Sequence, residues 1–111
     1  MPRQVLITSY EVSFATCSQG FNEWRKNIIV NTQDPATMCD IRFVDNPSSL
    51  PPEWEKVDEN GISVVYLPSD QFPSLLEVLQ TEKPLFLTLY AIGKHVLVQT
   101  GAEPPGEEAG V

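Results

Sequence analysis

The sequence has a single histidine, His95, only two cysteines, and none of the short motifs that build a phosphate-binding loop or a nucleophile elbow. Those sites depend on glycines spaced as G-x-x-x-x-G-K-S/T, G-x-G-x-x-G or G-x-S-x-G. A nucleophile and base would require Cys17 to meet His95 through tertiary structure. Zinc would require Cys17, Cys39, His95 and a carboxylate, without the short-range ligand pairs of structural sites. The sequence therefore predicts a protein that is not an enzyme and holds neither metal nor cofactor.

Positive charge is also scarce, because 7 Lys and Arg residues stand against 15 Asp and Glu residues, for a net charge of −8. Lys and Arg dominate binding to phosphate backbones, so this balance counts against a general nucleic-acid binder. Part of the acidic excess lies near the C-terminus, at Glu103, Glu107 and Glu108. A local basic patch such as Arg25-Lys26 is still compatible with the composition.

Long apolar runs are absent. The N-terminal stretch is interrupted by Thr8, Ser9 and Glu11, so we expect no signal peptide. No segment approaches the roughly 20 apolar residues that cross a bilayer. We therefore expect a cytoplasmic protein without membrane contact. In a reducing compartment Cys17 and Cys39 are most simply free thiols, and a bridge between them is the alternative.

The length of 111 residues fits one globular domain, which we place at residues 1–100. Residues 101–111 form an acidic segment rich in proline and glycine that cannot bury apolar surface. We expect this tail to be disordered.

The clearest local signals run from Gly61 to Thr100. A β-branched and aromatic run at 62–67 predicts a buried strand. A helix is expected at about 70–82, with Asp70 accepting hydrogen bonds from its first turn. Its apolar residues recur at helical spacing and fall on one face: Phe72, Leu75, Leu76 and Leu79. Strands at 85–90 and 95–100 then form a hairpin around Gly93.

The first hairpin strand presents two stripes, because side chains alternate across a strand. The leucine stripe is the natural partner of the helix: Leu85, Leu87 and Leu89. On the opposite face lie Phe86, Thr88 and Tyr90. This aromatic stripe requires a second layer, a partner subunit or a ligand.

Three further strands are expected before the long connection. The first, at 5–16, places Leu6, Tyr10, Val12 and Phe14 on one apolar face that Thr8 interrupts. Residues 21–32 read as strand or helix, and we choose strand. The third covers 38–44. The predicted fold is α+β: an antiparallel, curled sheet of about five to six strands with one main helix. One helix cannot cover both faces of such a sheet, which favours a homodimer.

The connection at 45–60 is rich in proline and acidic residues around Trp54. Long loops of this kind are functional or mobile. We interpret Trp54 as an apolar anchor that pins the loop to the core. Solvated charge is the simplest interpretation of the acidic residues, and a shared proton or a bound cation is the alternative.

Two kinds of binding protein remain. The first is a small interaction module that self-associates and binds an unidentified protein partner. The second is a single-stranded nucleic-acid binder, whose strand-strand-strand-strand-helix order is similar to that of small single-strand-binding modules, without a shared sequence motif. A further alternative is an acidic mimic of nucleic acid. The candidate binding surface consists of aromatic and basic residues, namely Phe86, Tyr90, Trp24, Arg25, Lys26, Lys94 and Trp54.

Overall fold

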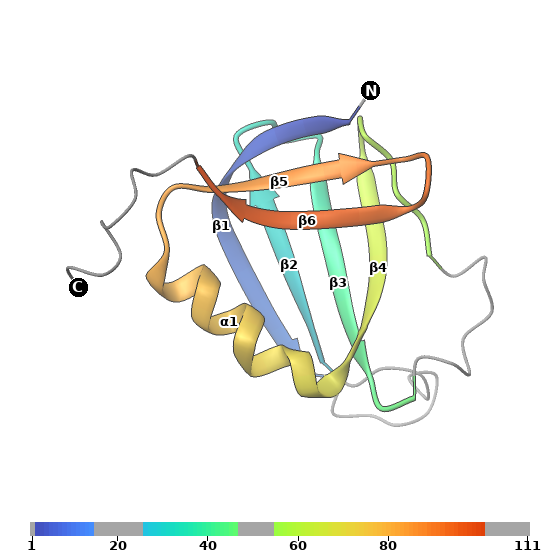
Figure 1. Cartoon of the computed structure of the whole chain (residues 1–111), viewed down its shortest axis with the longest axis vertical. Helices are drawn as coiled ribbons and strands as arrows, with labels where there is room; N and C mark the ends of the chain where they lie inside the picture. The colour runs from blue at the N-terminus through green and yellow to red at the C-terminus, as the bar shows by residue number, and fades with distance from the viewer. Residues whose placement is uncertain (1, 15–25, 47–54, 102–111) are drawn as a thin grey trace.

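The computed structural model describes residues 2–14, 26–46 and 55–101. In these ranges a curled sheet of six strands packs against one helix (Figure 1). The elements are β1 (Arg3–Phe14), β2 (Lys26–Thr32), β3 (Met38–Val44), β4 (Ile62–Pro68), α1 (Phe72–Thr81), β5 (Leu85–Tyr90) and β6 (His95–Thr100). The predicted α+β class with one main helix is confirmed.

The strand order is β4-β3-β2-β1-β5-β6, and β1 joins the two parts of the sheet. The N-terminal part of β1 pairs with β5, and its later part, from Ile7 to Phe14, pairs with β2. Figure 1 shows β5 and β6 running across β1 to β4 rather than alongside them. The sheet therefore curls around a single core.

The pairing of β3 with β4 corrects the expectation of a wholly antiparallel sheet. These two strands are parallel, with Met38 opposite Ile62, whereas the other neighbouring strands pair antiparallel. Parallel neighbours need a long crossover, and residues 45–61 provide it. At its end Lys56 pairs antiparallel with Val64, with backbone N···O distances of 2.9 and 2.7 Å.

An irregularity in β1 changes which residues face the core. The register with β2 shifts between Ile7 and Ser9, so Thr8 lies at a β-bulge. Before the bulge Val5 is buried, whereas after it Tyr10 and Val12 pack on the core cluster. Leu6 pairs with Phe86 on the other face, so the expectation that Leu6 shares a face with Tyr10 and Val12 is wrong. An extra residue reverses the side-chain alternation beyond it.

The leucine stripe of β5 faces the core that α1 also contacts. Leu85, Leu87 and Leu89 are buried and belong to the same core cluster as Leu79 of α1. The helix begins at Phe72, after a 3₁₀ turn at Ser69–Gln71. Gln71 rather than Asp70 occupies the N-cap position, and no side chain caps it, so the role expected for Asp70 is wrong. The 3₁₀ turn moves Asp70 out of reach of the first helical turn.

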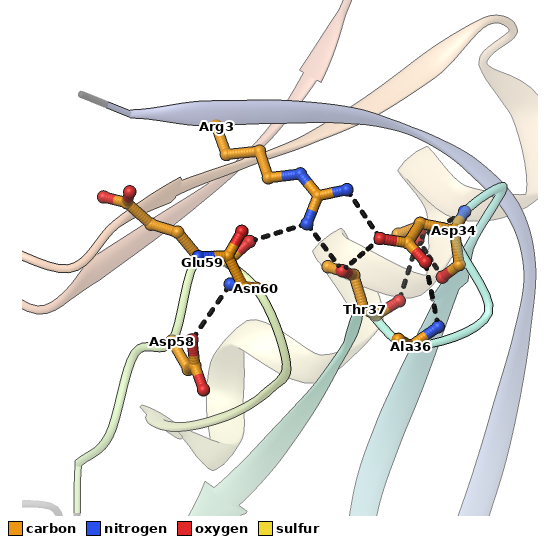
Figure 2. Close-up of polar contacts among 8 residues, drawn as sticks. Arg3, Asp34, Ala36, Thr37, Asp58, Glu59 and Asn60 are labelled. Atoms are coloured by element: carbon orange, nitrogen blue, oxygen red, sulfur yellow. Dashed lines mark hydrogen bonds and ion pairs between the residues drawn. The ribbon is translucent and has the colours of Figure 1, made fainter.

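A polar cluster around Arg3 holds the start of β1 to two turns (Figure 2). One guanidinium nitrogen, Nη1, donates to Thr37 Oγ1 and to the carbonyl oxygen of Glu59, both at 2.9 Å. The other, Nη2, donates to Asp34 Oδ2 at 2.6 Å. Asp34 also accepts hydrogen bonds from the Ala36 amide at 3.0 Å and the Thr37 hydroxyl at 2.9 Å. The cluster therefore links the β2–β3 turn, the 58–60 turn and β1.

Acid is expected to weaken this cluster. The hydrogen bond from Arg3, with those from Ala36 and Thr37, holds the pKa of Asp34 below its ordinary value of 3.8. Because the unfolded chain then binds the proton more readily, the stabilisation is present above that value and is lost as pH falls through the lowered pKa. We expect Asp34→Asn to lower the urea midpoint more at pH 7 than at pH 2.

Glu77→Gln is the matched control, because Glu77 is exposed on α1. Its effect on the urea midpoint should be small at both pH values. A loss in Asp34→Asn that is the same at pH 7 and pH 2 would contradict the role given to the charge of Asp34.

Candidate functional site

The candidate site is the outward face of β5, β6 and the first residues of β1. Alternation along β5 turns the leucines inward and Phe86 and Tyr90 outward, as the sequence predicted. Strand register places Leu6 and Gln99 on either side of Phe86, and His95 beside Tyr90. We call the apolar and aromatic residues of this surface the outer face: Leu6, Phe86, Tyr90, His95 and Leu97. Among the described residues no helix or strand covers it (Figure 1).

The centre of the outer face is a satisfied polar chain. Gln4 Nε2 donates to Thr88 Oγ1 at 3.4 Å, and Thr88 Oγ1 donates to Gln99 Oε1 at 2.7 Å. Thr88 is only 5% exposed, and its buried hydroxyl both donates and accepts a hydrogen bond in this chain. The chain ties β1, β5 and β6 together on the outer face.

The aromatic residues of the outer face have neighbours in the sheet. The rings of Tyr90 and His95 stack with centroids 4.4 Å apart and planes 17° apart. The Phe86 ring lies against Gly101, where a Cβ atom would approach Phe86 Cε2 to 3.3 Å. Glycine therefore lets the chain leave β6 close to Phe86. Both Phe86 and Tyr90 remain half-buried, with part of each ring open to a partner.

The free edge of β6 is the second feature of the site. In the described part of the chain β6 pairs with β5 and has no other strand beside it. Natural edge strands are blunted by charge, proline, bulges or a covering element. The β6 sequence, HVLVQT, has no proline, no bulge and no acidic residue, and Leu97 is 38% exposed on it. Within the described residues the outer backbone edge of β6 is therefore unpaired.

The structure brings only part of the predicted surface together. Lys94 is exposed in the turn that joins Tyr90 to His95 and has φ of 52°. Lys26, the first residue of β2, pairs with Phe14 at the end of β1 that is far from β5. Its Nζ is 4.6 Å from the centroid of the Phe72 ring. Trp24, Arg25 and Trp54 lie outside the described residues, so their predicted roles stay predictions.

Other basic side chains are held by carboxylates away from the outer face. Arg3 pairs with Asp34 at 2.6 Å, and Arg42 Nε pairs with Asp40 Oδ2 at 3.1 Å. Arg42 also donates to the Tyr66 hydroxyl at 3.1 Å. Lys94 therefore adjoins the outer face, whereas Lys26 and Arg42 do not.

Among the described residues the thiol of Cys39 is buried. Cys39 is a free thiol, and burial raises its pKa to about 12, with a further contribution from the charge of Asp40. A protonated thiol is a poor nucleophile. Within residues 2–14, 26–46 and 55–101, no three His, Cys, Asp or Glu side chains gather as metal ligands. In the same ranges no helix has the length and hydrophobicity to span a bilayer.

The predicted binding surface did not include three outer-face residues, namely Leu6, His95 and Leu97. Alternation along 95–100 does place Leu97 on the same side as His95. Leu97 matters for pairing only because β6 is the last strand of the sheet. In a central strand the backbone beside an exposed leucine would already be paired on both sides. Leu6 was hidden by the bulge at Thr8.

No protein-family model, curated protein or solved structure matches the chain. Function is therefore inferred from the geometry of the described residues alone.

Proposed function

We propose that the protein is a non-enzymatic interaction module that forms a homodimer by pairing β6 with β6 of a second copy. The observation that carries the proposal is the unprotected edge of β6, with Leu97 exposed along it. Pairing would extend the sheet across both copies and leave neither β6 edge open. The joined outer faces would then present Phe86 and Tyr90 from both copies to a further protein partner.

The sequence of β6 suits an antiparallel pair about a two-fold axis at Leu97. In this register Leu97 lies opposite Leu97 of the second copy, and His95 lies opposite Gln99 of that copy. Val96 lies opposite Val98 on the inner side. Paired residues share a face, and no like charges meet. The contact is self-complementary, as a two-fold interface requires.

Charge also supports β6 as the contact. A net charge of −8 makes two copies repel each other over most of their surface. The β6 strand contains no acidic residue, and Lys94 precedes it. Association through β6 would therefore join two strands that carry no acidic residue of their own.

A disulfide cross-link tests the register directly. In a Cys17→Ser background, Leu97→Cys is expected to form a covalent dimer on mild oxidation. Residues directly opposite in an antiparallel pair have Cα atoms about 4.5–5.5 Å apart, within the range of about 4.4–6.8 Å that a disulfide spans. The remaining thiol, Cys39, is buried and should not react. The readout is non-reducing electrophoresis.

Gln99→Cys in the same background is the matched control. It lies on the same face of the same strand, but in the proposed register it faces His95 of the second copy. It should cross-link much less than Leu97→Cys. Equal cross-linking of both variants, or of neither, would contradict this register.

Single-stranded nucleic acid is the alternative ligand of the outer face. The half-buried rings of Phe86 and Tyr90, with Lys94 beside them, are what support it. The distance of Lys26 from these rings and the pairing of Arg42 with Asp40 and Tyr66 favour the protein-interaction proposal instead.

A further inference from the structure

A second open strand edge lies on β1, beside a hollow. β1 pairs with β5 through residues 3–6, whereas from Ile7 onward its registered partner is β2. On the β5 side, the described strands therefore leave Thr8–Phe14 without a neighbour. A hollow of about 720 Å³ opens at the start of this edge, between β1, the end of α1 and the segment that leads into β5.

The hollow is lined by both apolar and polar residues. Its apolar lining comes from Ile7, Tyr10, Leu79, Pro84 and Leu85. Thr8, Ser9, Glu82 and Lys83 supply the polar groups. The volume falls within the range of about 300–1,000 Å³ that is usual for ligand sites. Thr8, the residue of the bulge, belongs to its lining, and bulges commonly re-aim a strand next to a site.

A free strand edge flanked by a helix is the arrangement in which proteins bind extended peptides. The main-chain groups of the edge hydrogen-bond to the peptide, and pockets take its alternate side chains. Thr8–Phe14 would span roughly 20 Å at about 3.3 Å per residue. At the far end Phe14 is 65% exposed, and its ring centroid lies 6.0 Å from that of Phe72. Apolar surface therefore lies at both ends of the edge, in the hollow at its start and on Phe14 at its end.

Glu11 argues against a second copy of this chain as the occupant. It lies midway along the open edge, and its carboxylate accepts a hydrogen bond from Asn31 at 3.1 Å. Two-fold pairing of β1 centred on the middle of this edge would set Glu11 opposite itself, and like charges directly opposite are destabilising. A basic residue at that position of an incoming strand would be favourable. The net charge of −8 likewise favours a basic partner over a second copy of this chain.

We propose that the β1 edge binds an extended peptide segment of another protein, which adds a strand along Thr8–Phe14. The segment buries an apolar side chain in the hollow and places a lysine or arginine opposite Glu11. This site is distinct from the β6 edge, because the two lie on opposite sides of β5 in the strand order. Peptide binding and dimer formation are therefore separate properties.

The test uses a fluorescein-labelled peptide with blocked ends, Thr-Val-Lys-Val-Thr-Leu-Thr, and the full-length protein. We expect its fluorescence anisotropy to rise with protein concentration. A peptide with both valines replaced by proline should not bind, because proline lacks the N–H needed for pairing. Hydrogen exchange should slow at Thr8–Phe14 on peptide binding and not at β6.

Thr8→Arg places a bulky charge in the lining of the hollow and should weaken binding at least tenfold. Ser74→Arg, on the exposed surface of α1, adds the same charge away from the hollow and should have no effect. Leu97→Lys should bind the peptide as the wild type does, whether or not the protein dimerises. The proposal is overturned if the valine peptide does not bind, if the proline peptide binds equally, or if Thr8→Arg has wild-type affinity.

Discussion

Truncation of Phe43 to alanine is expected to lower the free energy of unfolding by about 3–5 kcal/mol, the usual cost of removing a buried phenylalanine. Phe43 is 1% exposed in the centre of the core. Its ring meets that of Phe72 edge to face, with centroids 5.1 Å apart and planes 85° apart. The substitution removes apolar burial and this ring pair, and leaves a cavity between the sheet and α1. Urea denaturation monitored by circular dichroism measures the loss.

Phe14→Ala is the matched control for Phe43→Ala. Phe14 also contacts Phe72, but it is 65% exposed at the end of β1. Its truncation should cost less than about 1 kcal/mol, because little apolar area returns to water. Equal costs for the two substitutions would mean that Phe43 is not at the centre of the core.

Substitution of Leu97 by lysine is expected to weaken the dimer roughly 100-fold. Burying the exposed part of one leucine from each copy is worth about 1.5 kcal/mol per side chain, and about 1.4 kcal/mol is a factor of ten in affinity. The two lysines would in addition face each other across the pair. Sedimentation velocity over a range of concentrations measures the change.

Ile92→Lys provides the control for Leu97→Lys. Ile92 is 89% exposed in the turn between β5 and β6, so it adds the same charge close to β6 without entering the proposed contact. Its dimerisation should match that of the wild type within a few-fold. A Leu97→Lys protein that dimerises as well as Ile92→Lys would remove β6 as the interface.

Local patterns predicted most of the elements. The strand at 38–44, the helix near 70–82 and the hairpin at 85–100 all lie within two residues of their observed bounds. In these segments the side-chain period, the proline at the helix start and the glycine in the turn act over a few residues. Such signals do not depend on the rest of the chain.

Long-range features could not be predicted in the same way. The parallel pairing of β3 and β4 follows from where the 45–61 connection returns the chain, which no local pattern records. The bulge in β1 did leave a trace, because Thr8 interrupts the apolar alternation. From the sequence alone Thr8 is a polar residue within a regular face, whereas in the structure it marks the position at which the two faces of β1 exchange.

In the candidate site, too, local features could be predicted from the sequence and long-range features could not. Alternation predicted that Phe86 and Tyr90 turn away from the leucine stripe, and the burial of Leu85, Leu87 and Leu89 confirms it. Alternation does not determine which strand ends the sheet. The two open edges, on β6 and on Thr8–Phe14 of β1, became visible once the strand order was known.

The solution mass of the wild-type protein tests the central proposal most directly. Sedimentation equilibrium at micromolar chain concentrations is predicted to give twice the chain mass of 12.4 kDa, with dissociation on dilution. A mass of 12.4 kDa at every concentration, for a protein whose circular dichroism shows it to be folded, would contradict pairing through β6.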